Sequence, residues 1–347
     1  MTESQPERPI HQPIPPDILA RLDPEYAAFH NAVIRYVIPS HLLPWDPTKR
    51  TLPSNGASEP SKVGEIRDIP LDRFVMRIFT PEGTAPQGGW PLILYFHGGG
   101  WVMGDIATEN TFCTHMCKRA SCVVVSVAYR LAPEHPYPAA VEDAVEALRW
   151  VHENGATQLS TNVKRIAVGG CSSGGNLAAV LTHKAALLQP PIPLVFQLLI
   201  VPCTDNTANV DDPRYLSWSE NKNTIGLFLP RLLFFREKYV PNTNDRHEWE
   251  CSPILAPEED FRKLPKAWIG VAELDLLRDE AVAYGEKLKQ AGVEAEVNIY
   301  KGSPHTIMGL DGIQDFISVM RFMLFFDVDF EFILEFHSIA YLSRLEH

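Results

Sequence analysis

A serine between two glycines stands where a strand-like segment gives way to a helix-like one. The run Gly170-Cys171-Ser172-Ser173-Gly174 follows the apolar segment 165–169 and precedes the helix-forming segment 176–181. A serine on such a sharp turn presents its hydroxyl above the end of a sheet, and the glycines leave room for the tight backbone. A serine hydroxyl becomes a good nucleophile once a neighbouring base takes its proton. The pattern predicts that Ser172, the middle residue, is a nucleophile, and that the adjacent Cys171 is not.

A second glycine-rich segment could stabilise negative charge beside that serine. It reads His97-Gly98-Gly99-Gly100-Trp101 and follows the apolar run 90–96. Glycines at this point allow backbone N–H groups to turn inward, because no Cβ atom stands in the way. Two such donors can hold a developing oxyanion. We therefore predict an oxyanion hole at His97, Gly98 and Gly99, completed by the N–H of Ser173. The His97 side chain itself is expected to have a structural role.

An acid and then a histidine follow late in the chain, each on a loop after an apolar run. Asp275 comes after 267–272, and His305 comes after 296–300. A carboxylate of this kind holds a histidine in the tautomer that can accept a serine proton. Asp279 is a competing acid, but Asp275 is nearer to the strand end. Asp279 is expected in the first turn of a helix, where a negative charge is favourable.

Taken together, these motifs resemble the hormone-sensitive-lipase-like branch of the α/β-hydrolases, also called bacterial esterase family IV. Besides the two glycine-rich segments, the likeness is carried by 129–139 (YRLAPEHPYPA), 252–256 (SPILA) and 275–280 (DLLRDE), and it extends to residue 311. The resemblance implies a serine carboxylesterase in which Ser172, His305 and Asp275 form a catalytic triad. It implies short- and medium-chain or acetyl esters as small-molecule substrates, with no cofactor and no metal.

The chain departs from the family pattern at three positions. Cys171 stands where the family has Asp, Ser173 where it has Ala, and Leu276 where it often has Pro. The N–H of Ser173 is still available to an oxyanion. Losing an acid at 171 removes a hydrogen bond near the nucleophile and leaves the pH profile open.

Two other functions remain open at this stage. The same machinery could hydrolyse amides or lactones, and some plant relatives of this fold are non-enzymatic receptors for small molecules. A receptor would be expected to have a broken triad, whereas all three residues are present here.

Composition excludes several classes of partner. The net charge of −12 and the lack of a basic stretch argue against nucleic acid binding. The N-terminus has no apolar signal core, so a cytoplasmic enzyme is expected, with no stable membrane span and with a homodimer left open. The six cysteines show neither metal-binding nor disulfide spacing. The isolated histidines are expected at the surface: His115, His152, His183 and His247.

Alternating strand-like and helix-like segments predict an α/β-hydrolase fold with a mostly parallel sheet and helices on both faces. Strands are expected at 65–69, 74–79, 91–96, 122–128, 165–169, 195–201, 267–272 and 295–300. Helices are expected at 16–22, 29–37, 108–120, 139–154, 174–188 and 279–291.

We divide the chain into an N-terminal segment with lid helices (1–62), a core (63–311) and a tail (312–347). The core contains an insert at about 204–250, which is expected to form an apolar lid together with residues 17–45. The tail is unusual because seven of the seventeen Phe residues lie between Phe316 and Phe336, although charged residues interrupt the run. It could pack on the core, seek an apolar surface, or lie outside the selected enzyme.

Overall fold

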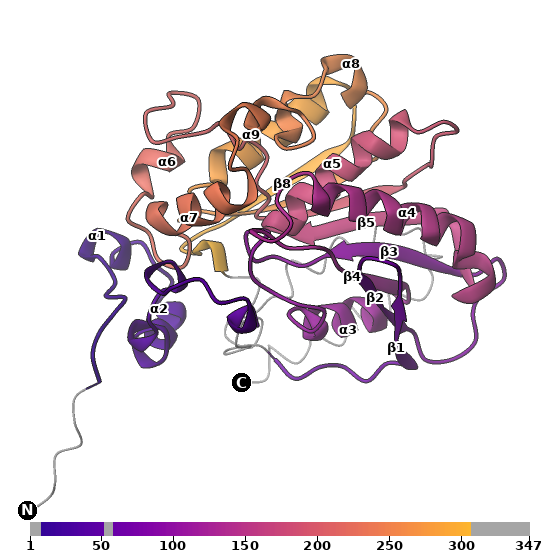
Figure 1. The fold of residues 1–347 in the computed structure, drawn as a ribbon, viewed down its shortest axis with the longest axis horizontal. Helices are drawn as coiled ribbons and strands as arrows, with labels where there is room; N and C mark the ends of the chain where they lie inside the picture. Colours follow the sequence, from indigo (N-terminus) through magenta and orange to yellow (C-terminus); the bar gives the residue numbers. More distant parts are fainter. Residues whose placement is uncertain (1–7, 52–57, 307–347) are drawn as a thin grey trace, which may run out of the picture. The chain divides into compact units, whose positions relative to one another are not determined.

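The central sheet has eight strands in the order β1-β2-β4-β3-β5-β6-β7-β8 (Figure 1). We describe it from a computed structural model that places residues 8–51 and 58–306. The tail at 312–347 lies outside the described residues. The strands are β1 (Glu65–Pro70), β2 (Val75–Thr80), β3 (Trp90–Phe96), β4 (Val123–Ala128), β5 (Thr161–Cys171), β6 (Phe196–Ile200), β7 (Ala267–Ala272) and β8 (Ala295–Tyr300).

All of the strand pairings from β4 to β8 are parallel, whereas β1 pairs with β2 and β2 with β4 in antiparallel fashion. The central strands are buried on both faces, as the neighbouring side chains Leu92, Ile93 and Leu94 of β3 show with 0% exposure. This explains why their sequences are continuously apolar and do not alternate. The predicted α/β fold with a mostly parallel sheet is confirmed.

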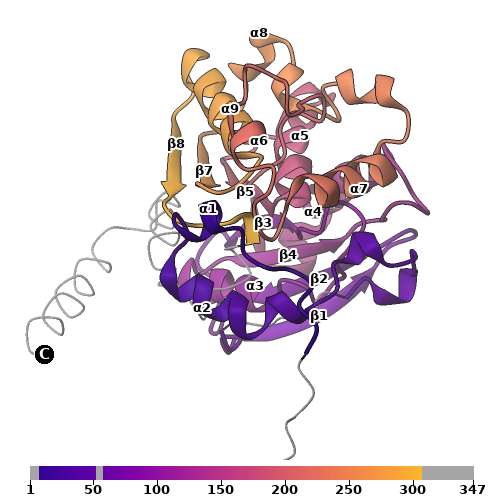
Figure 2. The same ribbon diagram turned by 90° about the vertical axis from the view of Figure 1, so that its left-hand side faces the viewer.

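Helices cover both faces of this sheet. Figures 1 and 2 show α3 on one face and the pair α4 and α5 on the other. Four helices that lie between strands of the sheet are within a few residues of their predicted positions, whereas α7 (Leu229–Tyr239) in the insert was not predicted. Their bounds are α3 (Asn110–Arg119), α4 (Ala139–Gln158), α5 (Ser173–Leu187) and α9 (Arg278–Gln290).

The N-terminal segment begins with α1 (Pro16–Leu19) and α2 (Pro24–Ala32). The predicted helix at 29–37 is wrong in its bounds. The helix begins at Pro24 because the Asp23 side chain accepts hydrogen bonds from Glu25 N and Tyr26 N, both at 2.9 Å. An Asp followed by Pro is a helix-start signal, since Pro tolerates the first turn. The chain then forms a short 3₁₀ turn at Ile34–Tyr36.

The insert at about 204–250 contains no strand. It forms α6 (Ser217–Glu220) and α7 (Leu229–Tyr239), and α8 (Glu258–Phe261) follows it. Two contacts show that the insert packs against the N-terminal segment. The rings of His41 and Phe228 meet edge to face, with centroids 5.1 Å apart. A small buried cluster also joins residues of α1 and α2 to Ile225 and Leu274. We call these two segments, 17–45 and 204–250, the cap.

Two histidines that were expected at the surface are buried. His183 of α5 is 1% exposed and packs against the rings of Trp249, Phe261 and Tyr284. Burial lowers its pKa to about 4, so the ring is neutral near pH 7. His115 of α3 is also buried, with a ring nitrogen in hydrogen-bond contact with Ser61. An isolated histidine in sequence thus need not be isolated in space.

Within residues 8–51 and 58–306, no helix is both long and apolar enough to cross a bilayer. All six cysteines are free thiols, and five of them are buried.

Candidate active site

The turn between β5 and α5 holds Ser172 in a backbone conformation that few residues adopt. Its φ is 55° and its ψ is −114°. A positive φ costs energy in a residue with a Cβ atom, and such strain is typical of functional turns. The neighbouring glycines are required by close packing. A Cβ atom on Gly170 would lie 2.3 Å from the Gly174 backbone, and one on Gly174 would lie 2.0 Å from Phe96 O. This turn places Ser172 at the carboxyl end of β5.

The loops after β7 and β8 bring an acid and a histidine to the same place. The Nε2 atom of His305 lies 2.8 Å from Ser172 Oγ, and its Nδ1 atom lies 2.6 Å from Asp275 Oδ2. A carboxylate can only accept, so Nδ1 carries a hydrogen and donates a hydrogen bond to Asp275. Nε2 is then left with a lone pair toward the Ser172 hydroxyl. The arrangement can therefore remove a proton from Ser172.

Asp275 is fully buried, and its other carboxylate oxygen accepts a hydrogen bond from Leu277 N at 3.1 Å. The competing acid Asp279 is engaged elsewhere. It accepts from Ser217 N at 2.7 Å and from Arg278 Nε at 2.7 Å, and it lies in the first turn of α9. Of these two acids, only Asp275 contacts His305.

The loop after β3 lies beside Ser172, but its residues have different functions. The His97 ring stacks on Tyr129 with centroids 4.5 Å apart, and its Nδ1 lies 2.7 Å from Gly98 O. His97 therefore braces the loop and does not line the cavity described below. Gly99 has a φ of +124°, and a Cβ atom there would lie 2.1 Å from Met103 O. The loop thus has a shape that only glycine permits.

Not all of the predicted oxyanion donors are free. The N–H of Gly98 already donates to Glu109 Oε1 at 2.8 Å. Donation by Gly98 to an oxyanion would require that this bond be shared or broken. The N–H groups of Gly99 and Ser173 have no acceptor among residues 8–51 and 58–306. Ser173 is the first residue of α5, where N–H groups lack helical partners. These two amides are the donors that remain available.

Glu109 is a polar residue of the site that sequence reasoning missed. Besides Gly98 N, it contacts Tyr95, whose hydroxyl donates to Oε2 at 2.6 Å. Burial raises its pKa to about 7, while the two hydrogen bonds lower it by a smaller amount. Its carboxyl group stands close to Cys171, since a Cβ atom on Gly98 would lie 3.3 Å from Glu109 Oε1 and 3.6 Å from Cys171 Sγ. Glu109 thus places a carboxyl group near Cys171, the position at which the family has an Asp.

Cys171 is not activated as a nucleophile. Burial raises the pKa of its thiol well above the ordinary value, and the charge of Glu109 raises it further. The reactive form of cysteine is the thiolate, so this thiol is inert near neutral pH. The group that is hydrogen-bonded to His305 Nε2 is the Ser172 hydroxyl.

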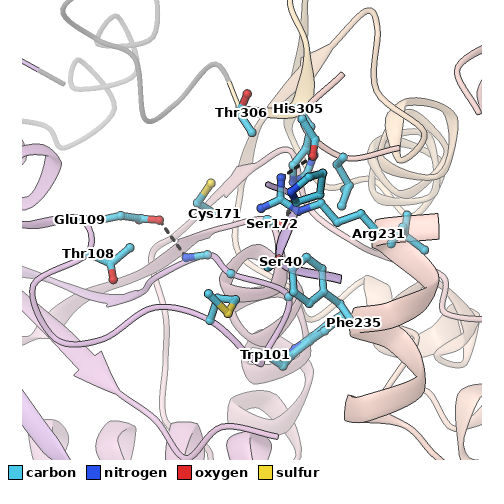
Figure 3. A pocket seen from close by; sticks show the side chains of 18 of the residues that line it. Ser40, Trp101, Thr108, Glu109, Cys171, Ser172, Arg231, Phe235, His305 and Thr306 are labelled. Carbon is cyan, nitrogen blue, oxygen red and sulfur yellow. Dashed lines mark hydrogen bonds between the residues drawn. The ribbon is translucent and has the colours of Figure 1, made fainter. Parts of the chain in front are cut away.

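A cavity of about 650 Å³ opens onto Ser172 and His305. Its walls come from the loop after β3, the start of α3 and the two segments of the cap. Figure 3 shows Glu109 and Cys171 on one side of Ser172, and Arg231 and Phe235 on the other. Most of the wall is apolar, as is typical of sites for small organic molecules. In the described part of the chain, no group of His, Cys, Asp or Glu could hold a metal ion.

An eight-stranded sheet of this order, with a serine on a strand–helix turn and an acid and a histidine on later strand ends, defines an α/β-hydrolase. The profile of a family described as having the alpha/beta hydrolase fold matches residues 93–309. The chain belongs to that family, in its hormone-sensitive-lipase-like branch.

Individual relatives agree with this assignment. An AB hydrolase superfamily protein of Schizosaccharomyces pombe is 45% identical over 316 residues, which cover 87% of this chain and 91% of that protein. The esterase LipI of Mycobacterium tuberculosis is 41% identical, over 71% of this chain and 74% of LipI. A solved α/β-hydrolase enzyme from the metagenome of Lake Arreo has a TM-score of 0.76 and 30% identity, over 89% of this chain and 98% of that one.

Proposed function

We propose that this protein is a serine carboxylesterase in which Ser172 is the nucleophile, His305 the general base and acid, and Asp275 the residue that orients His305. The observation that carries this proposal is the hydrogen-bonded series from Ser172 Oγ through His305 to Asp275 at the floor of an apolar cavity. Family membership and relatives named as esterases support ester hydrolysis.

The chemistry follows from the positions of these atoms. As Ser172 Oγ attacks the ester carbonyl carbon, its proton passes to His305 Nε2. The carbonyl oxygen becomes an oxyanion, which the N–H groups of Gly99 and Ser173 stabilise. His305 then gives the proton to the leaving alcohol, and an acyl-enzyme remains on Ser172. Water, deprotonated by His305, attacks this acyl-enzyme, releases the carboxylic acid and restores the serine.

The cavity supports a substrate of limited size. The cap forms part of its wall, with Ile34 and Val37 on one segment and Leu227 and Leu232 on the other. Each methylene group that is buried against such a wall contributes about 0.8 kcal/mol of binding. Short- and medium-chain esters, or acetyl esters of larger alcohols, fit a pocket of this volume better than long acyl chains at a lipid interface. A receptor without activity is disfavoured because the series at Ser172 is complete.

The test compares Ser172→Ala with Cys171→Ala, using p-nitrophenyl butyrate and a fluorescent alkylphosphonate that labels active serines. Ser172→Ala should lower kcat/KM by a factor on the order of 10⁴–10⁶ and abolish labelling, while the protein remains folded by circular dichroism. Cys171→Ala should keep both properties within about tenfold. Activity that survives Ser172→Ala and disappears in Cys171→Ala would overturn the assignment. A parallel panel of p-nitrophenyl butyramide and a γ-lactone separates esters from amides and lactones.

A further inference from the structure

Arg231 lines the cavity without an acidic partner among the described residues, as does Arg236, whose Nη1 donates to the backbone oxygens of Asn206 and Ala208. Arg231 extends from α7 toward Ser172 and His305 (Figure 3). Its Nη1 donates to the backbone oxygen of Gly226 at 2.7 Å, and its guanidinium carbon lies 5.7 Å from the centre of the Phe235 ring. Within the described part of the chain it forms no ion pair. Burial lowers its pKa, yet an arginine stays charged at any physiological pH.

Two other arginines of the molecule show the paired arrangement. Arg130 pairs with Asp143 at 2.8 Å and with Glu142 at 2.9 Å. Arg278 pairs with Glu220 at 2.8 Å and with Asp279 at 2.7 Å. A charge that leaves water is normally paired, because desolvation without a partner costs several kcal/mol. Arg231 breaks this rule inside the proposed substrate pocket.

The donors of Arg231 that remain unused lie on one edge of the guanidinium group. Its Nε is buried without an acceptor, and its Nη2, which is not buried, has no acceptor among residues 8–51 and 58–306. These two nitrogens form the edge that can bind a carboxylate through two parallel hydrogen bonds. The groups around it are neutral. Tyr26 and Thr306 share a hydrogen bond of 3.0 Å and line the same part of the cavity.

Glu109 is the one acidic side chain among the described residues that line the cavity, whereas Lys49, Arg231 and Arg236 are basic. The acidic side chain, Glu109, lies on the side of Cys171, and Arg231 lies on the side of Phe235 (Figure 3). A substrate with a negative charge is repelled from the first side and attracted to the second. Because the net charge of the chain is −12, this attraction is local and does not arise from a general positive field.

We propose that Arg231 is a specificity residue that binds an ionised carboxyl group of the substrate, a few bonds away from the scissile ester. The substrate class is then a half-ester of a dicarboxylic acid, or a hydroxy acid that is acylated on its hydroxyl group and keeps its carboxylate free. This inference rests on the proposed esterase function and narrows it.

Two matched pairs of esters test the proposal, one with the carboxylate in the acyl part and one with it in the alcohol part. The acyl pair is monoethyl glutarate and ethyl 5-oxohexanoate, in which a methyl ketone replaces the carboxylate. The alcohol pair is acetoxyacetate and acetoxyacetone. Hydrolysis is followed by chromatography in the wild type, Arg231→Met, Arg231→Lys and Lys222→Met. The last variant removes an exposed positive charge of the same insert that does not line the cavity.

In the wild type, kcat/KM should favour the anionic member of one pair by about tenfold. Arg231→Met should lower kcat/KM for that member about 10- to 100-fold, the range for a hydrogen bond to a charged group, and change the neutral member less than about threefold. The kcat/KM of Arg231→Lys for the anionic member should lie between those of the wild type and Arg231→Met, because lysine keeps the positive charge but cannot form two parallel hydrogen bonds to a carboxylate. Lys222→Met should behave as the wild type. Faster hydrolysis of the neutral member in both pairs, or an equal loss for both members in Arg231→Met, would overturn the proposal.

A measurement on the wild type alone tests the proposal even if the Arg231 variants fail to fold. Pentanoate should inhibit hydrolysis of a neutral ester competitively and at least tenfold more tightly than pentanamide. Equal inhibition by the two would contradict the role of Arg231. If instead no ester, neutral or anionic, is hydrolysed in a manner that depends on Ser172, the esterase proposal itself fails.

Discussion

The two sides of the cavity are built in different ways. On the core side, Glu109 accepts from Gly98 N, and His97 Nδ1 contacts Gly98 O. The glycines there are required, because a Cβ atom would lie 2.1 Å from Met103 O at Gly99 and 2.0 Å from Phe96 O at Gly174. On the cap side, the wall is mostly apolar, and Arg231 forms no ion pair with the described residues. In the proposed function, the core side holds the reacting atoms and the cap side selects the substrate. Substitutions on the core side should therefore lower kcat, and those on the cap side should change the preference between substrates.

The sharpest contrast within the core side is between two neighbouring acids. Asp275→Asn should lower kcat/KM about 10⁴-fold at neutral pH, because an amide favours the wrong tautomer of His305. Asp279→Asn should cost less than about tenfold, because Asp279 contacts Ser217 and Arg278 and not His305. Steady-state kinetics on p-nitrophenyl butyrate measures both. A loss at Asp279 that equals or exceeds the loss at Asp275 would reverse the assignment.

The rigidity of the oxyanion loop gives the next largest effect. Gly99→Ala should lower kcat about 10²- to 10³-fold, because its Cβ atom would collide with Met103 O and displace a donor to the oxyanion. Gly83→Ala is the matched control. Gly83 also has a positive φ, +94°, but nothing lies within 4 Å of the Cβ position. Gly83→Ala should thus lose some stability and keep its kcat. Equal kcat values for the two variants would remove the loop from the mechanism.

Glu109 should make the stability of the protein depend on pH. Its pKa rises from 4.5 to about 7 on folding, so its favourable contribution to stability is complete below about pH 4.5 and is lost as pH rises through 7. A shift of this size corresponds to about 3 kcal/mol at most. Glu109→Gln does not ionise, and it can accept from Gly98 N while donating to the Tyr95 hydroxyl.

We expect Glu109→Gln to lose less stability than the wild type between pH 5 and 8.5, as measured by urea unfolding. The exposed Glu237→Gln should follow the wild type. Glu109→Ala leaves the Gly98 amide without its acceptor, and should lower kcat about tenfold with little change in KM. Parallel stability curves for the wild type and Glu109→Gln would contradict the raised pKa.

The cap side should show smaller, graded effects. Across p-nitrophenyl esters from acetate to palmitate, kcat/KM should rise about fourfold per methylene until the cavity is full, and then fall. Leu232→Ala enlarges the wall and should move the optimum to a longer acyl chain. Leu187→Ala, at an exposed position on α5, should leave it unchanged. A maximum at palmitate that increases further on emulsified substrate would indicate a lipase and not a pocket-limited esterase.

The core side could largely be predicted from sequence, because its signals are local. Glycines at a strand exit and a serine on a strand–helix turn are physical requirements of the adjacent backbone, so Gly99 and Ser172 stand out in a single chain. Glu109 and Arg231 do not. Each derives its importance from groups distant in sequence: Tyr95 for Glu109, and Ser172 and His305, which line the same cavity, for Arg231. The predicted bounds of α2 are wrong for a local reason: the helix starts after Asp23, whose side chain caps it, five residues before the predicted start.

The histidine loop is attached to the cap as well as to the core. Asp23 N donates to Gly302 O at 2.9 Å, and the Tyr26 hydroxyl lies 3.0 Å from Thr306 Oγ1, so both bonds flank His305. A displacement of α2 would therefore also strain the loop that carries His305. In the proposed mechanism, we expect opening of the cap at α2 to disturb the hydrogen bond between His305 and Ser172, so that proton transfer is favoured while the cap stays in place.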